Sequence, residues 1–376
     1  MKVEFFKHSL GKAERDSLDK TLRSLYLTTG KQVDIFEKGL AAYSGVSQAV
    51  GLTSCTAAMH LALLAAGIGE GDEVITTPMT FVATSHAILM AGATPVFVDV
   101  EPATGNIDAA RISAAITKKT KAILPVHLYG QMADMKTILA IAKKHKLVVI
   151  EDAAHVLEAS RDGVRPGARS FGACLSFYAT KSITSGEGGA FITNNAQAAK
   201  MVTRLRLHGV NRELVQRERT KLNTYDITEL GWKYNMDNID AALLTPQLKT
   251  IKRNHARRMA IAKRYRAAFE GLVDMPAMLP NSVHAHHLFP IWVNAKHRDR
   301  IALVLKEKGV GVSVVHYPPV HLLEYYKKRF GYKKGDFPLA ESIGPRAISL
   351  PLYPLLTDKE IEYVIKEVRA AVIQYS

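Results

Sequence analysis

Short apolar runs alternate with helical patterns over residues 45–200 of this 376-residue chain. Runs rich in β-branched and aromatic residues and bounded by turn-forming residues predict strands. These runs are 73–77, 95–99, 122–126, 148–151, 174–178 and 190–193. Apolar residues at helical spacing predict helices between the earlier strands, at 56–66, 82–90, 108–116 and 135–145. This alternation predicts an α/β domain with a mostly parallel sheet between helices, and a mixed sheet where the last two strands follow each other too closely for a helical crossover.

The pattern changes after a long amphipathic helix predicted near residues 237–270. Beyond it we expect strands at 288–293 and 312–316, a helix at 298–308, and a closing helix at 358–373 with Thr357 as its N-cap. The predicted organisation has three parts. They are an N-terminal arm over residues 1–30 with one helix at 12–26, a large α/β domain over 31–250, and a smaller C-terminal α+β domain over 251–376.

Composition favours an ordinary globular protein of a reducing compartment. Hydrophobic residues make up 47% and charged residues 23%, which leaves ample material for a core. Cys55 and Cys174 are too few for a disulfide framework, so we expect a cytoplasmic protein. Charges within the first seven residues argue against a signal peptide. Residues 74–98 lack charge over a length that could span a bilayer, but Pro78, Gly92 and Pro95 interrupt them, so we expect no membrane insertion.

The net charge of +15 and pI near 9.6 favour an anionic partner. The basic segment 249–266 would be the platform for a nucleic acid. A simpler interpretation is a solvated helix face, with Ile251, Met259 and Phe269 turned inward. Because no nucleic-acid-binding motif accompanies the charge, we predict no nucleic-acid partner. A small phosphorylated ligand would benefit from the same field.

Three segments place reactive groups near the carboxyl ends of predicted strands, where open parallel sheets bind ligands. Strand 148–151 delivers Asp152 and His155; a lone carboxylate there is more often a helix cap, metal ligand or ribose ligand. Lys181 follows strand 174–178 in an apolar, hydroxyl-rich setting that includes Ser176. A lysine there is usually a surface cation, but desolvation would lower its pKa and free the amine to form a Schiff base.

The third segment, residues 53–59, is a turn of small residues that enters an apolar helix. Free backbone N–H groups at a helix start bind anions, although a plain Ser/Thr N-cap explains the segment if it stands alone. Together the segments offer a carboxylate for a pyridine nitrogen, a lysine for a Schiff base and a cradle for a phosphate. Pyridoxal phosphate (PLP) chemistry requires these three groups.

Motif strings over nearly the whole length resemble the nucleotide-sugar aminotransferases of the DegT/StrS group, which have the aspartate-aminotransferase fold (fold type I of PLP-dependent transferases). The strings are LTTG at 27–30, TFVAT at 80–84, PVHLYG at 125–130, EDAAH at 151–155, GEGG at 186–189, LGWKYNM at 230–236, HYPPVH at 316–321 and SLPLYP at 349–354. The resemblance implies PLP as cofactor and a homodimer with shared active sites.

By this resemblance Lys181 carries the cofactor as a Schiff base, Asp152 pairs with the ring nitrogen and His155 lies near the phenolic oxygen. Phe81 would stack on the ring. The phosphate would be held by Ser176 and by the amides of Cys55 and Thr56. The residues expected to line the sugar-nucleotide pocket are Thr29, His316, Tyr317 and His321.

Two departures from the family pattern affect the phosphate site. Cys55 replaces a glycine, and it would be strained if that position needs positive φ. Lys233 stands where the family has asparagine and Asn235 where it has arginine, in a segment that reaches the phosphate of the neighbouring subunit. Either residue could contact that phosphate.

The expected activity moves an amino group from L-glutamate to a nucleotide-linked keto sugar, at C4 of an NDP-4-keto sugar. The product would be an NDP-amino sugar for a surface polysaccharide or glycoconjugate. Alternatives are a C3-keto-sugar or cyclitol aminotransferase and, outside the enzymes, a basic regulatory or nucleic-acid-binding protein. Lysine at 181 argues against the dehydratases of the group, which carry histidine there. His284, His286 and His287, or His316 with His321, could ligate a metal, but no acidic or cysteine partner is spaced with them, so we predict none.

Overall fold

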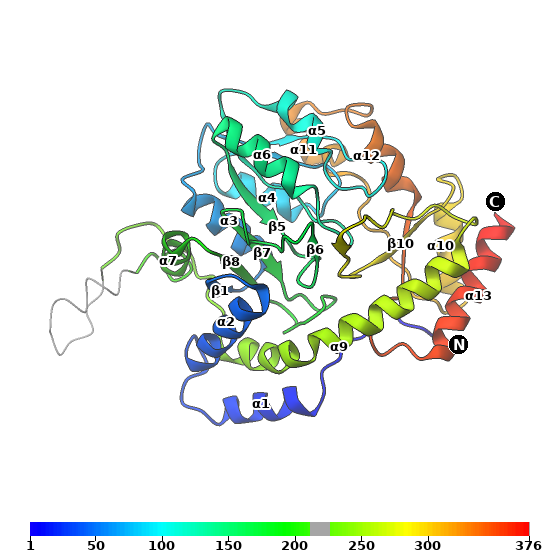
Figure 1. Cartoon of the computed structure of the whole chain (residues 1–376), viewed down its shortest axis with the longest axis horizontal. Helices are drawn as coiled ribbons and strands as arrows, with labels where there is room; N and C mark the ends of the chain where they lie inside the picture. Colours follow the sequence, from blue (N-terminus) through cyan, green and yellow to red (C-terminus); the bar gives the residue numbers. More distant parts are fainter. Residues whose placement is uncertain (211–225, 376) are drawn as a thin grey trace.

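A seven-stranded mixed sheet forms the centre of the computed structural model, which describes residues 1–210 and 226–375 (Figure 1). Its strand order is β1-β8-β7-β5-β4-β2-β3. The strands are β1 (Gln48–Leu52), β2 (Glu73–Thr76), β3 (Thr94–Phe97), β4 (Thr120–Ile123), β5 (Val148–Asp152), β7 (Gly172–Ser176) and β8 (Gly189–Thr193). Only β8 runs antiparallel to both of its neighbours in this sheet. The predicted α/β class, and the mixed pairing where 174–178 meets 190–193, are confirmed.

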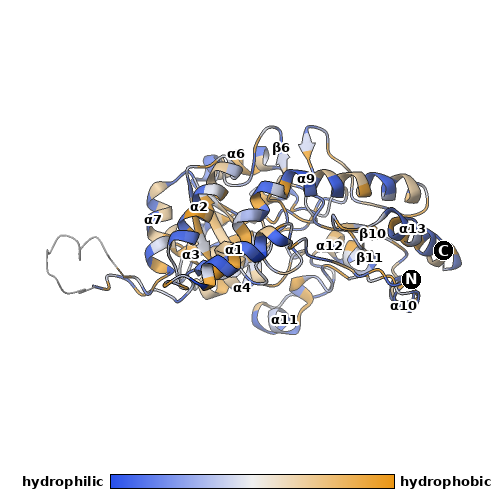
Figure 2. Ribbon diagram, turned by 90° about the horizontal axis from the view of Figure 1, so that it is seen from below, coloured by the Kyte–Doolittle hydropathy of each residue, from blue (hydrophilic) through white to orange (hydrophobic). Residues whose placement is uncertain are grey.

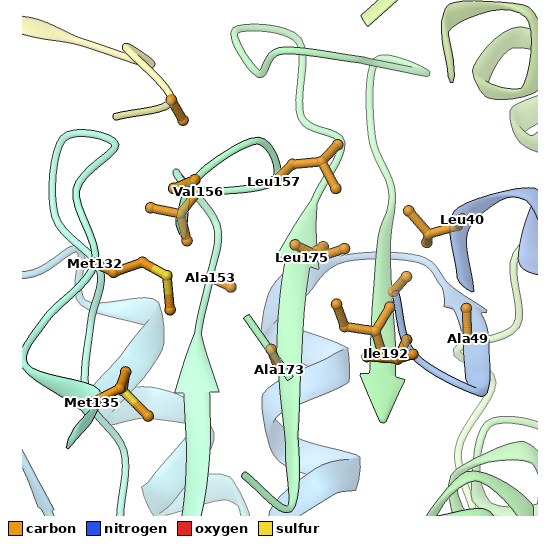
Figure 3. Packing of buried hydrophobic residues seen from close by; sticks show 14 of the residues in the cluster. Leu40, Ala49, Met132, Met135, Ala153, Val156, Leu157, Ala173, Leu175 and Ile192 are labelled. Atoms are coloured by element: carbon orange, nitrogen blue, oxygen red, sulfur yellow. The ribbon is translucent and has the colours of Figure 1, made fainter. Parts of the chain in front are cut away.

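Helices cover both faces of this sheet, so nearly all its strand residues are buried. One face packs against α3 (Cys55–Ala65), α4 (Ala83–Met90) and α7 (Ala196–Leu205). The other packs against α2 (Lys31–Ser44), α5 (Ala109–Ile112), α6 (Met135–His145) and the first half of α9 (Asn238–Phe269). Figure 3 shows this second face, where Leu40 and Ala49 lie beside Ile192, next to Ala173 and Leu175. Burial of each such large apolar side chain contributes about 1.5–3 kcal/mol to the stability of the fold.

The long predicted helix is confirmed as α9, which spans 32 residues and connects two hydrophobic cores (Figure 1). The Asp237 side chain caps it by accepting a hydrogen bond from the Asp240 amide at 2.8 Å. Ile251 lies in the first core, between the large sheet and the helices on its second face. Ile261 and Phe269 lie in a second core, formed with the C-terminal elements. The predicted domain boundary near residue 250 therefore falls inside a continuous helix, and it remains a proposal.

The second core is a small α+β assembly. It joins the end of α9 to the two-stranded sheet of β10 (Phe289–Trp292) and β11 (Ala347–Leu350), and to α10 (Arg298–Glu307) and α13 (Asp358–Gln374). Shorter elements between α10 and β11 are η2 (Val320–Leu322), α11 (Glu324–Phe330), α12 (Pro338–Ile343) and η3 (Gly344–Arg346). Thr357 caps α13 in a capping box with Glu360, as predicted. A separate pair, β6 (Ser160–Arg161) and β9 (Ser282–Val283), links the two parts of the chain.

The N-terminal residues contact both cores. Val3 is buried in the second core and pairs with Val310. Further along, α1 (Lys12–Leu22) packs on α9 and ends earlier than the predicted 12–26. The outward side of α1 is strongly hydrophilic (Figure 2). The extent of the arm, residues 1–30, remains a proposal.

The predicted strand at 312–316 is wrong. Ser313 alone forms a bridge there, to Ser349 of β11, and the chain then turns before Pro318 and Pro319, whose missing N–H groups cannot continue a ladder. This turn carries His316 toward the large sheet. Strand β1 was not predicted, because its sequence QAVGL contains glycine and few β-branched residues.

The uncharged segment 74–98 forms β2, α4 and β3, as predicted. No helix in the described ranges is both long and apolar enough to cross a bilayer. Both cysteines are buried as free thiols. Part of the basic face of α9 is paired with acids: Arg257 and Arg264 contact Asp358, and Arg258 contacts Glu158.

Candidate active site

A cavity of about 570 Å³ opens where the parallel strands end. Asp152 is the last residue of β5 and Ser176 the last of β7. The cavity is lined by most of the residues predicted to bind the cofactor, together with one residue predicted to bind the substrate. They are Cys55, Thr56, Phe81, Asp152, His155, Ser176, Lys181 and His316. The topology thus brings the three predicted segments to a single site.

Asp152 is only 6% exposed and is fixed by three contacts. Thr84 Oγ1 donates to Oδ2 at 2.7 Å, the Ala154 amide donates to Oδ1 at 3.2 Å, and the Cys55 Sγ lies 3.9 Å from Oδ1. Thr84 also lies 2.7 Å from the Thr80 hydroxyl. Because a charge-assisted bond is the stronger one, Thr84 gives its single proton to the carboxylate, so Thr80 must donate to Thr84. Sequence reasoning did not assign Thr84 this role.

Lys181 lies half-buried in the turn after β7. Burial lowers the pKa of its ammonium to about 8, opposed by the nearby Cys55 and Asp152. A fraction of the amine is therefore neutral near pH 8 and able to attack a carbonyl. Its Nζ lies 3.4 Å from the Nε2 of His287, a residue that the sequence suggested only as a metal ligand.

Two histidines and an aromatic ring surround the cavity. The His155 and His316 rings are nearly parallel, with centroids 6.1 Å apart and an interplanar angle of 6°. Burial, followed by the charge of Lys181, lowers the pKa of both, that of His316 to about 3, so both imidazoles are neutral. His155 Nδ1 is buried and lacks a hydrogen-bond partner in the described chain, which suits a polar group on a bound ring. Phe81 is 63% exposed at the rim.

The start of α3 fits a phosphate group. Ser54 caps the helix by accepting from the Ala57 amide at 3.0 Å, while the amides of Cys55 and Thr56 have no acceptor within the described residues. Both residues line the cavity. A Cβ at Gly189 would overlap the backbone of Ser54 and Cys55, so glycine allows β8 to approach the cradle. These are free N–H groups at a helix N-terminus, which is where a phosphate binds.

Cys55 is not strained. It is the first residue of α3 and is not among the described residues with positive φ. Its Sγ lies 3.3 Å from the Cys174 carbonyl, below the cradle. Cysteine in place of glycine therefore leaves the backbone of the cradle unstrained, and the amide of residue 55 stays free to bind a phosphate.

Five predicted site residues lie outside the lining of this cavity. Asn235 donates to Thr29 at 2.6 Å, and Lys233 is exposed in the same extended segment. Tyr317 is 45% exposed and stacks under Arg298, next to His316. His321 is fully buried, bonds Glu341 at 3.0 Å and packs on Phe337, so its predicted role as a substrate ligand remains a proposal.

His284 and His286, which the sequence offered as metal ligands, lie in a chain of structural hydrogen bonds. His284 Nδ1 accepts from the His286 amide at 2.8 Å, and its carbonyl accepts from His255 at 2.8 Å. Over residues 1–210 and 226–375, no group of three or more His, Cys, Asp or Glu side chains is arranged to hold a metal ion.

Comparisons with known proteins agree with this geometry. A model of the DegT/DnrJ/EryC1/StrS aminotransferase family matches residues 8–369. The spore coat polysaccharide biosynthesis protein SpsC of Bacillus subtilis is 42% identical over 369 residues, covering 96% of this chain and 94% of SpsC. The structure of DesV from S. venezuelae superposes with a TM-score of 0.88 at 33% identity, covering 96% of this chain and 94% of DesV. NtdA of Bacillus subtilis, with bound cofactor PMP, superposes with a TM-score of 0.88 at 31% identity, covering 99% of this chain and 86% of NtdA.

Proposed function

Because the chain belongs to the DegT/DnrJ/EryC1/StrS aminotransferase family and is a PLP-dependent sugar aminotransferase with the fold of that class, we propose that it moves an amino group from L-glutamate to C4 of a nucleotide-linked 4-keto sugar. Family membership overturns the non-enzymatic alternative of a basic regulatory or nucleic-acid-binding protein. The observation that carries the proposal is the convergence of Lys181, Asp152 and the free amides of α3 on one cavity.

Each group in the cavity suits one task. When bound, PLP supplies an electron sink for the carbon that loses its proton. Asp152, held by Thr84, would keep the ring nitrogen protonated. The Cys55 and Thr56 amides and the Ser176 hydroxyl would hold the phosphate. Phe81 would cover one ring face, and neutral His155 would contact a polar substituent through its unpaired Nδ1.

Lys181 would bind the cofactor covalently and then act on the substrates. Once displaced by the amino donor, the Lys181 amine would take the proton from the donor Cα as general base and deliver it to C4′ of the cofactor as general acid. A pKa near 8 suits both tasks at neutral pH, because neither the neutral nor the charged form is then rare.

The sugar substrate is the finer part of the proposal. The name of SpsC, a spore coat polysaccharide biosynthesis protein, supports an amino sugar destined for a surface polysaccharide. The net charge of +15 would attract a nucleotide diphosphate. The choice of C4 rests on the motif strings; C3-keto sugars and cyclitols are the alternatives. The free, buried cysteines support a cytoplasmic site of action.

We propose a homodimer with shared active sites, and the position of three residues supports it. Thr29, Lys233 and Asn235 lie outside the cavity of their own chain. We propose that Lys233 and Asn235 contact the cofactor phosphate of a second copy, and that Thr29 contacts the substrate bound there. The exposed apolar side chains Leu25, Tyr26 and Leu230 would be covered by that copy. We propose that Tyr317 and His316 contact the substrate within each site.

Lys233 and Asn235 should differ in their effect on cofactor affinity. Asn235 already bonds Thr29, whereas Lys233 is an exposed cation. Lys233→Ala should weaken PLP binding about 10-fold or more, the loss of one charge-assisted hydrogen bond. Asn235→Ala should change PLP affinity far less. Fluorescence titration of the two cofactor-free variants with PLP compares them, and a larger loss in Asn235→Ala would reverse the assignment.

Thr84→Val should slow the reaction by about 10-fold, because it removes a hydrogen bond to a charged group while keeping the side-chain volume. The loss should appear in kcat and spare the Kd of PLP, since Thr84 contacts Asp152 rather than the phosphate cradle. Thr203→Val on α7, whose hydroxyl bonds its own helix, is the matched control. Equal kcat in both variants would contradict the role of Thr84.

The proposed function is tested as two half-reactions. Glutamate should bleach the visible absorbance of the PLP-loaded protein and yield 2-oxoglutarate. A panel of nucleotide-linked 3-keto and 4-keto sugars should then restore the absorbance, with the aminated position read by NMR. Absence of bleaching by glutamate would reject this donor, and amination at C3 would reject the C4 assignment.

A further inference from the structure

One buried histidine contacts the amine of Lys181 from a distant part of the chain. His287 lies just before β10, 106 residues from Lys181, and its Nε2 is 3.4 Å from Nζ. It is 8% exposed, and burial, followed by the charge of Lys181, holds the pKa of its imidazole well below the ordinary value. The ring is therefore neutral. When Lys181 carries its proton, the ammonium can only donate, so Nε2 accepts and the ring proton lies on Nδ1.

The segment that carries His287 is anchored by backbone contacts on both sides of this residue. The Ala285 amide donates to the Gly130 carbonyl at 2.8 Å, and the Leu288 amide to the Tyr129 carbonyl at 3.1 Å. Gly130 has a φ of 119°, and a Cβ there would lie 2.9 Å from the amides of residues 286 and 287. Only glycine permits this approach. The backbone contacts of this segment thus hold His287 in place and do not depend on the His287 side chain.

A buried ion pair ties the same segment to the Lys181 turn. Arg258 contacts Glu158, and its Nε donates to the Ala285 carbonyl at 3.3 Å. Glu158 also accepts from the Ser182 hydroxyl at 3.0 Å, next to Lys181. Arg258 and Glu158 are 3% and 7% exposed. Since a buried charge is stable only when it is paired, this pair holds the two segments in fixed relative positions.

We propose that His287 is a positioning residue for the reaction, which accepts a hydrogen bond from the Lys181 amine and keeps that amine aimed at the cavity whenever it is not bound to the cofactor. This inference rests on the proposed role of Lys181. A free lysine side chain samples many rotamers, and fixing it lowers the entropy cost of reaching the donor carbon. The other titratable groups facing the amine are Asp152, Cys55, His155 and His316, all of which line the cavity.

Two variants that differ by one methylene test the contact. The side-chain amide of His287→Gln reaches the place of Nε2, whereas that of His287→Asn stops near Nδ1. In the cofactor-free protein, the reaction of Lys181 with acetic anhydride is followed by mass spectrometry against pH. The wild-type midpoint should lie near 8. The Gln variant should keep it, and the Asn variant should shift it down by about one pH unit, because an acceptor stabilises the ammonium form.

The loaded enzyme gives an independent readout. The kinetic isotope effect is the ratio of the bleaching rates with ordinary glutamate and with glutamate deuterated at Cα. This ratio should rise in His287→Asn and stay at the wild-type value in His287→Gln. Melting temperature and PLP affinity should remain similar in both variants, which a general loss of packing would not allow. A wild-type labelling midpoint in His287→Asn, or equal shifts in both variants, would overturn the role of His287. Failure of borohydride to fix PLP on Lys181 would overturn the proposed function instead.

Discussion

Lys181→Ala should lower the rate of amino transfer by more than about 10³-fold, because it removes both the covalent anchor and the proton carrier. The variant should still bind PLP, since the phosphate cradle at the start of α3 is built from backbone amides. Bleaching by glutamate, measured by stopped flow, gives the rate.

Three controls test whether the lost rate comes from the missing amine of Lys181. Treatment with borohydride should attach PLP to the peptide that contains Lys181 in the wild type and to no peptide of the variant. Added methylamine should restore part of the lost rate if only the amine is missing. Lys263→Ala, on the exposed side of α9, should behave as wild type. Normal turnover by Lys181→Ala would refute the assignment.

Asp152→Asn should reduce kcat by about 10²–10³-fold, the effect of removing one partner from a buried charge pair. Asparagine occupies the same volume and can still accept from the Ala154 amide, so the shape of the cavity is kept. What it loses is the charge that keeps the ring nitrogen protonated.

The protonation state can be measured directly. With PLP labelled with ¹⁵N in the ring, the nitrogen chemical shift should report a protonated ring in the wild type and a neutral ring in Asp152→Asn. Asp162→Asn, in an exposed turn, is the matched control. A protonated ring in Asp152→Asn, with unchanged kcat, would remove Asp152 from the chemistry.

The hydrophobic pattern along the chain predicted the strands and helices whose own residues determine their structure. Most strands of the sheet lie within two residues of their predicted bounds, because buried parallel strands are short, continuous apolar runs flanked by turns. The helix α9 was predicted equally well, near 237–270 against Asn238–Phe269 in the structure. Strand β1 was missed because its pairing with β8, rather than its own composition, makes it a strand.

The positions of Asp152 and Lys181 in one cavity were predictable, because each follows a predicted strand of the sheet. Contacts between side chains far apart in the sequence were not predictable. Thr84 lies 68 residues from Asp152, and His287 lies 106 residues from Lys181. No spacing rule connects such positions, and hydroxyls and histidines are common in structural roles. Only the fold brings these pairs into contact.

The position of Val3 has a consequence for how the chain acquires its structure during synthesis. Val3 is buried among residues of α9, β11 and α13, and the Gly311 amide donates to its carbonyl at 2.8 Å. The second core therefore combines Val3 with residues 261–372, whereas the core between the large sheet and its helices uses residues 33–285. The ribosome must deliver residues 309–311 before Val3 finds its backbone partners. Joining ends so distant in sequence is entropically costly and slow, so the large sheet should form first and the second core should assemble last.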